Sequence, residues 1–162
     1  MDAIEALYRK YAPDVFRFAY YLSGERSDAE DITSETFVRV WTSGAPIRAA
    51  TVRAYLFTIA RNVFLKTRRH ESRHVSLDEH APSSERLHDA VETRSDLDAV
   101  LARLDKLPAI DRAALMMRAR DDMSYEEIAE ALGISVGAAR VRIHRVRRAL
   151  ADLRSDSSPP HT

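Results

Sequence analysis

The chain has 162 residues, of which 45% are hydrophobic and 31% are charged, values typical of a soluble globular protein with one domain or two small ones. It has no cysteine, which excludes disulfides, thiolate zinc sites and cysteine nucleophiles, and its 25 basic residues equal its 25 acidic residues in number. No apolar run approaches the ~18 residues of a membrane span, and the N-terminus lacks the order of a signal peptide. We therefore expect a cytoplasmic protein without membrane insertion.

Apolar residues recur every three or four positions through most of the chain, which predicts an all-α fold. In the first part we expect three helices, over about 2–23, 28–43 and 49–70. Pro13 lies within the first helix and Gly24 ends it, while Ser27 and Glu30 are typical of a capping box at the start of the second. These helices form a predicted domain over 1–70.

The periodicity stops after this domain. Residues 71–94 are polar and are expected to form a linker. Further helices are predicted over about 95–106 and 108–121, followed by a helix-turn-helix over 124–150. The fold class is therefore two small helical domains, 1–70 and 95–154, joined by a flexible linker and followed by a disordered tail over 155–162.

The helix-turn-helix has a capping signal at each turn. Ser124 and Glu127 form a capping box, Gly133 suits a left-handed helix end, and Ser135 caps the second helix. In the second helix an apolar stripe leaves a basic face opposite it, formed by Arg140, Val141, His144, Arg145, Arg147 and Arg148. Guanidinium groups on such a face can contact base edges and phosphates in the major groove, although a solvated basic face on a structural helix is the alternative.

Together with motifs in the first part of the chain, this helix-turn-helix resembles a bacterial RNA polymerase sigma factor of the extracytoplasmic-function (ECF) group. Leu115–Arg120 and SYEEIAEALGISVGAARVRIHRVRRAL (124–150) resemble region 4, which reads the −35 promoter element. AEDITSETFVRVW (29–41) and AYLFTIARNVFLKTRR (54–69) resemble region 2. The resemblance implies promoter DNA and core RNA polymerase as partners, through the clamp helices of the largest subunit and the flap of the second-largest, together with an anti-sigma factor. It implies no enzyme activity, no catalytic residue and no cofactor.

The region 2 resemblance gives two further sets of site residues. It assigns recognition and opening of the −10 element to a basic helix face: Arg61, Asn62, Lys66, Arg68 and Arg69. The loop 43–52 would form the wall of a pocket for an unstacked base. It assigns polymerase binding to an acidic helix with a hydrophobic anchor: Asp28, Glu30, Asp31, Glu35 and Trp41. The alternatives are a solvated basic face, and core positions for Phe37 and Trp41, of which core is favoured for Phe37.

Two other functions compete with a sigma factor. A stand-alone helix-turn-helix regulator would bind a palindromic operator without polymerase, and the acidic helix followed by 54–69 argues against it. His70-Glu-Ser-Arg-His74 satisfies the H-E-x-x-H zinc-protease pattern, with His80 at the place of a third ligand. Leu77, however, stands where the longer motif has a glycine, so we expect no metal. Departures from the family at Ala138, Ala139, Val141 and His144 leave the preferred −35 sequence unpredicted.

Overall fold

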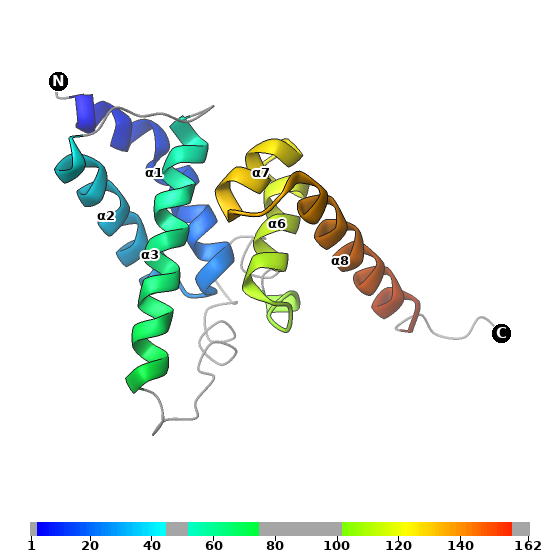
Figure 1. Ribbon diagram of the computed structural model, residues 1–162. Helices are drawn as coiled ribbons and strands as arrows, with labels where there is room; N and C mark the ends of the chain where they lie inside the picture. Colours follow the sequence, from blue (N-terminus) through cyan, green and yellow to red (C-terminus); the bar gives the residue numbers. More distant parts are fainter. Residues whose placement is uncertain (1–2, 45–51, 75–101, 157–162) are drawn as a thin grey trace.

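The computed structural model of the chain describes residues 3–44, 52–74 and 102–156, and all the regular structure in these ranges is helical. The helices are α1 (Ala3–Ser23), α2 (Arg26–Ser43), α3 (Val52–His74), α6 (Ala109–Ala119), α7 (Tyr125–Leu132) and α8 (Val136–Asp156) (Figure 1). The all-α fold class is confirmed. None of the described helices is long and apolar enough to cross a membrane.

Helices α1, α2 and α3 pack on one another as the first group (Figure 1). Their centre is aromatic: the rings of Phe18 and Phe57 stack at a centroid distance of 4.5 Å, and both side chains are buried. Phe37 of α2 is also buried and meets the half-exposed Tyr8 edge-on at 5.0 Å. The expectation that Phe37 is a core residue is therefore confirmed.

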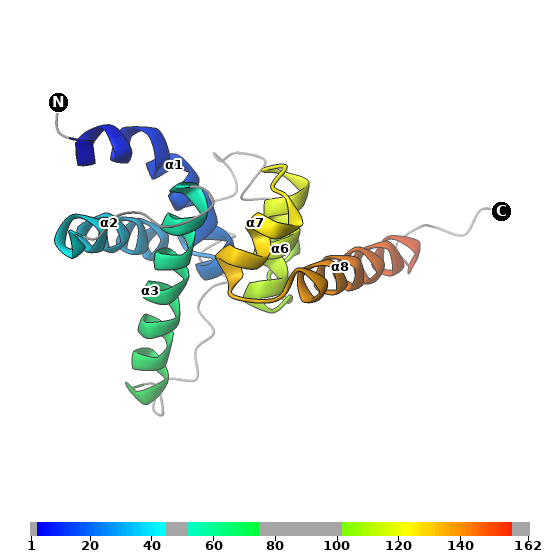
Figure 2. The same cartoon turned by 45° about the horizontal axis from the view of Figure 1, so that its top comes forward.

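Helices α6, α7 and α8 form the second group, around the fully buried side chains of Met117, Ile128 and Ile143. Arg142 of α8 lies on the α6 side and donates to the Asp111 carboxylate at 2.7 Å. This ion pair and the apolar stripe of α8 hold it on α6. Most of the length of α8 extends away from the rest of the molecule (Figure 2).

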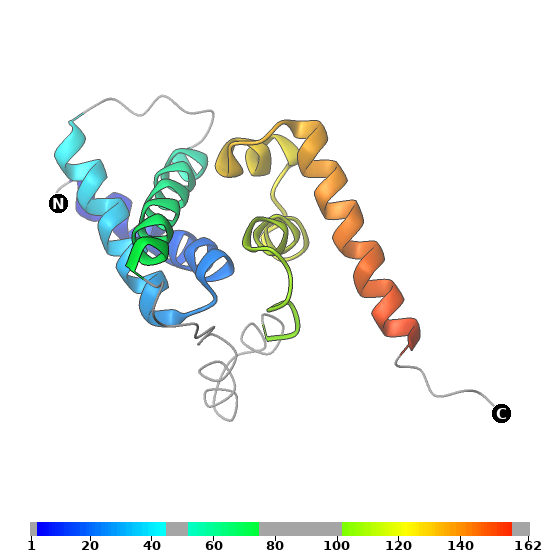
Figure 3. The ribbon, with the colours of Figure 1, turned by 60° about the horizontal axis from the view of Figure 1, so that its bottom comes forward.

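The two groups share one continuous core. α1 packs against α6 and α3 packs against α7, so the second group lies directly beside the first (Figure 3). The buried guanidinium of Arg112 in α6 donates to the backbone oxygens of Tyr21 at 2.5 Å and Leu22 at 2.9 Å. These carbonyls belong to the last turn of α1, whose acceptors lack partners within the helix. Arg112, which belongs to the second group, therefore caps the C-terminal end of α1 in the first group.

Three helix ends differ from the prediction. α2 begins at Arg26, so Ser27 lies within its first turn and the predicted capping box does not form. The reason is Gly24, whose φ of 74° reverses the chain immediately after α1 and leaves only Gly24 and Glu25 between the helices. α3 continues through His74, beyond the expected end at 70. α8 continues through Asp156, so 155 and 156 are helical rather than part of a disordered tail.

Other predictions fall on undescribed residues. The predicted linker from 75 onward, the tail from 157 onward and the core of the loop 43–52 lie outside the described ranges. So does most of the predicted helix over 95–106. In its described part the chain turns at 104–106, where the Leu107 N–H donates to the Leu104 oxygen at 3.0 Å and Leu104 is buried.

Candidate nucleic-acid interface

The helix-turn-helix forms with the predicted caps. The Ser124 side chain accepts from the Glu127 N–H at 3.1 Å at the start of α7. Gly133 ends α7 in the left-handed region, with a φ of 67°, and the Ile134 N–H reaches back to the Ala129 oxygen at 3.0 Å. Ser135 accepts from the Ala138 N–H at 3.0 Å at the start of α8. The turn between α7 and α8 is thus fixed at both ends.

The outer face of α8 carries the residues predicted for the −35 element. Ala139, Ile143 and Val146 are buried against α6 and α7, whereas the six predicted residues are all exposed. We call them the α8 face: Arg140, Val141, His144, Arg145, Arg147 and Arg148. No acidic residue interrupts this stretch of the helix. It therefore presents a concentrated positive charge together with an apolar side chain, Val141, that is 48% exposed.

An aromatic ring supports one end of the α8 face. The guanidinium of Arg140 lies 5.1 Å from the centroid of Tyr125, and that of Arg118 lies 4.5 Å from the same ring. Arg118 also donates to the Met123 oxygen at 2.9 Å, which fixes its position. Tyr125 therefore restricts the Arg140 side chain through cation–π attraction. Sequence reasoning missed this role, because spacing alone does not reveal a contact between α7 and α8.

The exposed edge of α3 carries most of the residues predicted for the −10 element. Asn62, Lys66, Arg68 and Arg69 are exposed, and the Arg68 guanidinium lies 5.5 Å from the centroid of the Phe64 ring. We call these four residues the α3 track. The ring of Phe64 is buried, so the core of the first group holds one of the four basic or polar side chains in place.

Arg61 does not belong to this exposed track. It is partly buried against α7, donates to the Ala131 oxygen at 3.4 Å and donates to the Asn62 side chain at 3.0 Å. Burial lowers the pKa of its guanidinium. In this arrangement Arg61 binds the C-terminal end of α7, where helix carbonyls attract a cation. Arg61 therefore lies apart from the four exposed residues, and its contact with the −10 element stays a prediction.

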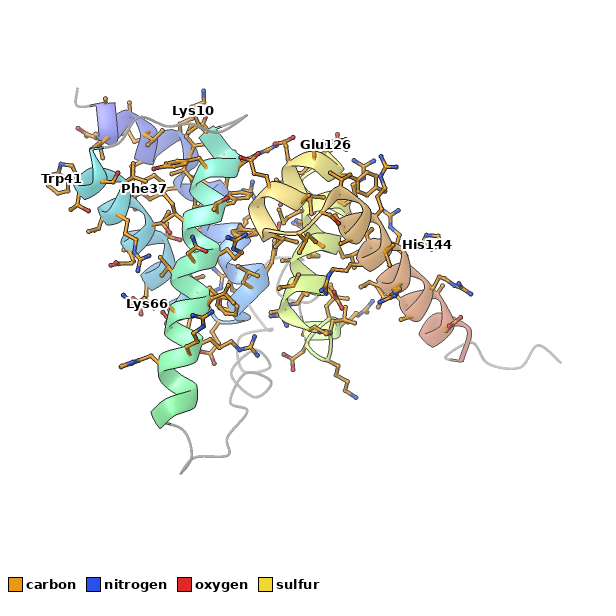
Figure 4. The ribbon with its side chains drawn as sticks, in the orientation of Figure 1. Lys10, Phe37, Trp41, Lys66, Glu126 and His144 are labelled. Atoms are coloured by element: carbon orange, nitrogen blue, oxygen red, sulfur yellow. The ribbon has the colours of Figure 1, made fainter. Side chains whose placement is uncertain are left out.

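The predicted polymerase-binding residues lie on α2. Glu30, Asp31 and Glu35 are exposed and Asp28 is partly exposed, while Glu35 forms an ion pair with Arg39 at 3.1 Å. Trp41 is 67% exposed near the end of the helix and points outward, whereas Phe37 points into the first group (Figure 4). The core alternative is thus wrong for Trp41. We call these five residues the α2 face: Asp28, Glu30, Asp31, Glu35 and Trp41.

The three surfaces lie on different sides of the molecule. Trp41 and His144 point away at opposite ends, with Lys66 of α3 between them (Figure 4). In every view α6 and α7 lie between α3 and α8 (Figures 1–3). The arrangement separates an acidic surface with an aromatic anchor from two basic surfaces. Such separation suits contacts with several partners at once, and the zero net charge conceals it.

The H-E-x-x-H pattern falls at the end of α3. His70 is exposed there, and it directly follows the basic residues Arg68 and Arg69 in the sequence. No group of three His, Asp or Glu side chains that could hold a metal occurs in the part of the chain that the structure describes. The side chains of His74 and His80 lie outside that part.

Sequence reasoning also missed the residues that join the two groups. Arg53 of α3 forms an ion pair with Glu127 of α7 at 2.8 Å, and the Thr58 hydroxyl donates to the Glu130 oxygen at 3.3 Å. Burial raises the pKa of Glu127, but the Arg53 side chain and the Ser124 contacts outweigh it, so that the pKa lies below its usual value. These residues are about 70 positions apart in sequence, and no local pattern signals the pairing.

Comparison with known sequences matches both halves of the chain. The family described as Sigma-70 region 2 matches residues 7–74, and the family described as Sigma-70, region 4 matches residues 97–150. The chain is similar to the ECF RNA polymerase sigma factor SigE of Mycolicibacterium smegmatis, with 38% identity over 94% of this chain and 62% of that one. It is also similar to SigL of Mycobacterium tuberculosis, with 34% identity over 91% of this chain and 86% of SigL.

Solved structures show the same similarity. The sigma factor RpoE, in its complex with the anti-sigma factor NepR from Bartonella quintana, matches with a TM-score of 0.72 and 25% identity, over 95% of this chain and 98% of that one. CnrH, in complex with the cytosolic domain of CnrY, matches with a TM-score of 0.67 and 28% identity, over 96% and 90% of the two chains.

The order of the two regions decides between the hypotheses. A stand-alone helix-turn-helix regulator accounts for the region 4 match alone, whereas this chain matches region 2 and region 4 in succession. Its similarity to SigL extends over most of both chains. The alternative of a stand-alone regulator is therefore excluded, and the chain belongs to the ECF group of RNA polymerase sigma factors.

Proposed function

We propose that the protein binds core RNA polymerase and directs it to promoters through two DNA contacts. The α2 face binds the clamp helices of the largest polymerase subunit, with Trp41 as the anchor. The α8 face contacts the −35 element, and the second group also binds the flap of the second-largest subunit. The α3 track and Arg61 contact the −10 element as its strands separate. The protein itself makes and breaks no covalent bond and acts in the cytoplasm.

The observation that carries this proposal is the separation of the three charged surfaces. A large aromatic side chain that is 67% exposed, on the same helix as four acidic residues, is typical of a binding hot spot for a protein partner. An acid-free basic helix face after a helix-turn-helix turn is typical of major-groove binding. The α3 track is a second basic surface, and such a surface suits the phosphate backbone of single-stranded DNA. One polymerase–promoter complex would use all three.

Regulation by an anti-sigma factor belongs to the same proposal. The similar sigma factor RpoE is bound to the anti-sigma factor NepR, and the similar chain CnrH is bound to the cytosolic domain of CnrY. A partner of this kind would block the polymerase-binding or DNA-binding surfaces until a signal releases it. Co-purification of the tagged protein from its native cells, followed by mass spectrometry, would identify it.

Single-surface variants test the division of labour. Trp41→Ala should weaken co-migration with core polymerase in gel filtration at least tenfold, because it removes a large exposed aromatic anchor. Arg145→Ala with Arg148→Ala should leave co-migration unchanged but weaken the promoter complex of the assembled holoenzyme in a gel shift. Arg9→Ala, at an exposed position of α1, is the control. Equal loss of both activities in each variant would contradict the assignment of separate surfaces.

A further inference from the structure

The side of α8 that points most directly away from the core of the second group is centred on Val141. Val141 stands two residues after Ala139 and two before Ile143, both of which are buried against α6 and α7. At about 100° per residue, two positions correspond to about 200° around the helix, so Val141 lies opposite the buried stripe. His144, one turn further on, is exposed and also points away from the core (Figure 4).

Val141 is an apolar side chain at the centre of a basic surface. Among the side chains of the second group that the structure describes, it is the only large hydrophobic one that is exposed. A single exposed valine is ordinary on a protein surface, so its position is what distinguishes it. Arg140 lies about 100° to one side of Val141 around the helix and Arg145 about 40° to the other. The charges of the α8 face therefore flank an apolar centre.

The residue one turn before Val141 has no side chain. Gly137 is exposed, and a Cβ atom built on it would meet no atom of the described protein within 4 Å. Its φ is not positive, so neither packing nor backbone conformation requires glycine here. Glycine within a helix lowers its stability relative to alanine. What Gly137 provides is a bare stretch of backbone, which lets α8 approach another surface more closely than a side chain would allow.

The major groove of DNA offers a match for this apolar centre. In a helix-turn-helix, the first residues of the second helix contact base edges there. The groove is about 12 Å wide and a helix with its side chains is about 10–12 Å across, so residues opposite the core meet the floor of the groove. Among the groups that base pairs expose on that floor, the C5-methyl of thymine is the apolar one. Against a polar base edge, a valine would leave donors or acceptors without partners.

We propose that Val141 selects a thymine in the −35 element through van der Waals contact with its C5-methyl group. The bare backbone at Gly137 allows α8 to come close enough for that contact. This inference rests on the proposed function of the α8 face and adds the kind of base that the face prefers. The basic side chains around Val141 hold the helix in the groove, while the preference at this base pair comes from the methyl group.

Replacement of thymine by uracil tests the contact, because it removes the methyl group and leaves base pairing unchanged. The probe is a fluorescein-labelled promoter fragment from which polymerase carrying this chain transcribes. Each thymine of its −35 element, on either strand, is replaced singly, and binding of the assembled holoenzyme is measured by fluorescence anisotropy. At one position the parent should bind the uracil fragment roughly threefold to tenfold more weakly, as expected for the loss of one buried methyl group.

Val141→Ala should bind the thymine and uracil fragments at that position equally, because its side chain is too short to reach the methyl group. The substitution is at an exposed position and alanine favours a helix, so the fold is retained. Arg147→Ala is the matched control on the α8 face. Arg147 lies about 120° around the helix from Val141, towards the phosphates at the side of the groove. Its replacement should weaken binding to both fragments by the same factor and reduce the salt dependence.

The results that would overturn the inference differ from those that would overturn the proposed function. The inference fails alone if the parent binds the promoter but tolerates uracil at every position, or if the −35 element has no thymine on either strand. It also fails alone if Val141→Ala keeps the full preference for thymine, or if Arg147→Ala loses that preference equally. If polymerase carrying this chain binds no promoter, the proposed function fails, and this inference fails with it.

Discussion

Tyr125 shows how a residue without a predicted role can shape the DNA-binding surface. Its ring contacts the guanidinium groups of both Arg118 and Arg140, and only Arg140 belongs to the α8 face. A cation–π contact at a partly exposed site contributes about 0.5–1 kcal/mol. The ring therefore reduces the freedom of Arg140 before it meets DNA.

Substitution of Tyr125 should alter the selectivity of promoter binding. Tyr125→Leu removes the aromatic face, and we expect discrimination between −35 sequences to fall about twofold to fivefold in run-off transcription, with polymerase binding unchanged. Tyr125→Phe retains the ring and should restore the discrimination. If both variants behave alike, the ring does not position Arg140.

Arg112 makes the second residue-scale prediction. Arg112→Met keeps the apolar volume of the side chain but leaves the Tyr21 and Leu22 oxygens without their charged donor. We expect the free energy of unfolding to fall by about 2–4 kcal/mol, since hydrogen bonds from charged groups are strong and their loss is costly in a buried site. Urea denaturation measures the change. Arg103→Met, at an exposed position, should alter the free energy by less than about 0.5 kcal/mol.

At the scale of elements, the caps of α7 and α8 could be predicted and the start of α2 could not. Ser124, Gly133 and Ser135 act through neighbours three or four positions away, so the sequence contains both partners of each contact. Ser27 and Glu30 have the same pattern, yet the reversed backbone at Gly24 starts α2 earlier. A capping pattern therefore predicts a helix near it, while the preceding turn decides the first residue.

The start of α7 should make stability dependent on pH. The pKa of Glu127 is lowered: burial raises it, but Arg53 and Ser124 outweigh this effect. The ionised Glu127 therefore stabilises the fold above its unfolded pKa, near about 4.3, and this contribution is lost as the pH falls through the lower folded pKa. Glu127→Gln should be less stable than the parent by about 1 kcal/mol at pH 7 in urea titrations.

The same comparison at low pH provides the check. As the pH falls below the lowered pKa of the folded state, the parent loses the contribution of the charged Glu127, so the difference between the two proteins should shrink towards zero. A constant difference from pH 7 to pH 3 would show that the carboxylate charge does not act through Arg53.

At the scale of the whole molecule, the sequence predicted the surfaces but not their mutual arrangement. The α8 face and four of the five predicted α3 residues are exposed, and the residues of the α2 face are at least partly exposed, because helical periodicity places them opposite buried stripes. The contacts between the domains follow no such period. Arg53 and Glu127, or Arg112 and Tyr21, are distant in sequence. Four of the interdomain acceptors are backbone oxygens, which any residue would supply.

The packing of the first group against the second also explains part of the zero net charge. Opposite charges from the two groups meet at Arg53–Glu127 and Arg17–Asp121, whereas the α8 face and the α2 face remain outside. Some of the acidic and basic residues thus stabilise the contact between the two domains. The remaining charges are available for a protein partner on one side and for nucleic acid on the other.

Run-off transcription with purified core polymerase on genomic promoter fragments tests the central claim, that this chain directs polymerase to promoters through two coupled DNA contacts. We predict specific transcripts only when both chain and polymerase are present, and a loss of more than tenfold when either Arg145 and Arg148 or Lys66 and Arg69 are replaced by alanine. Transcripts that do not depend on the chain, or that survive both pairs of substitutions, would contradict the account.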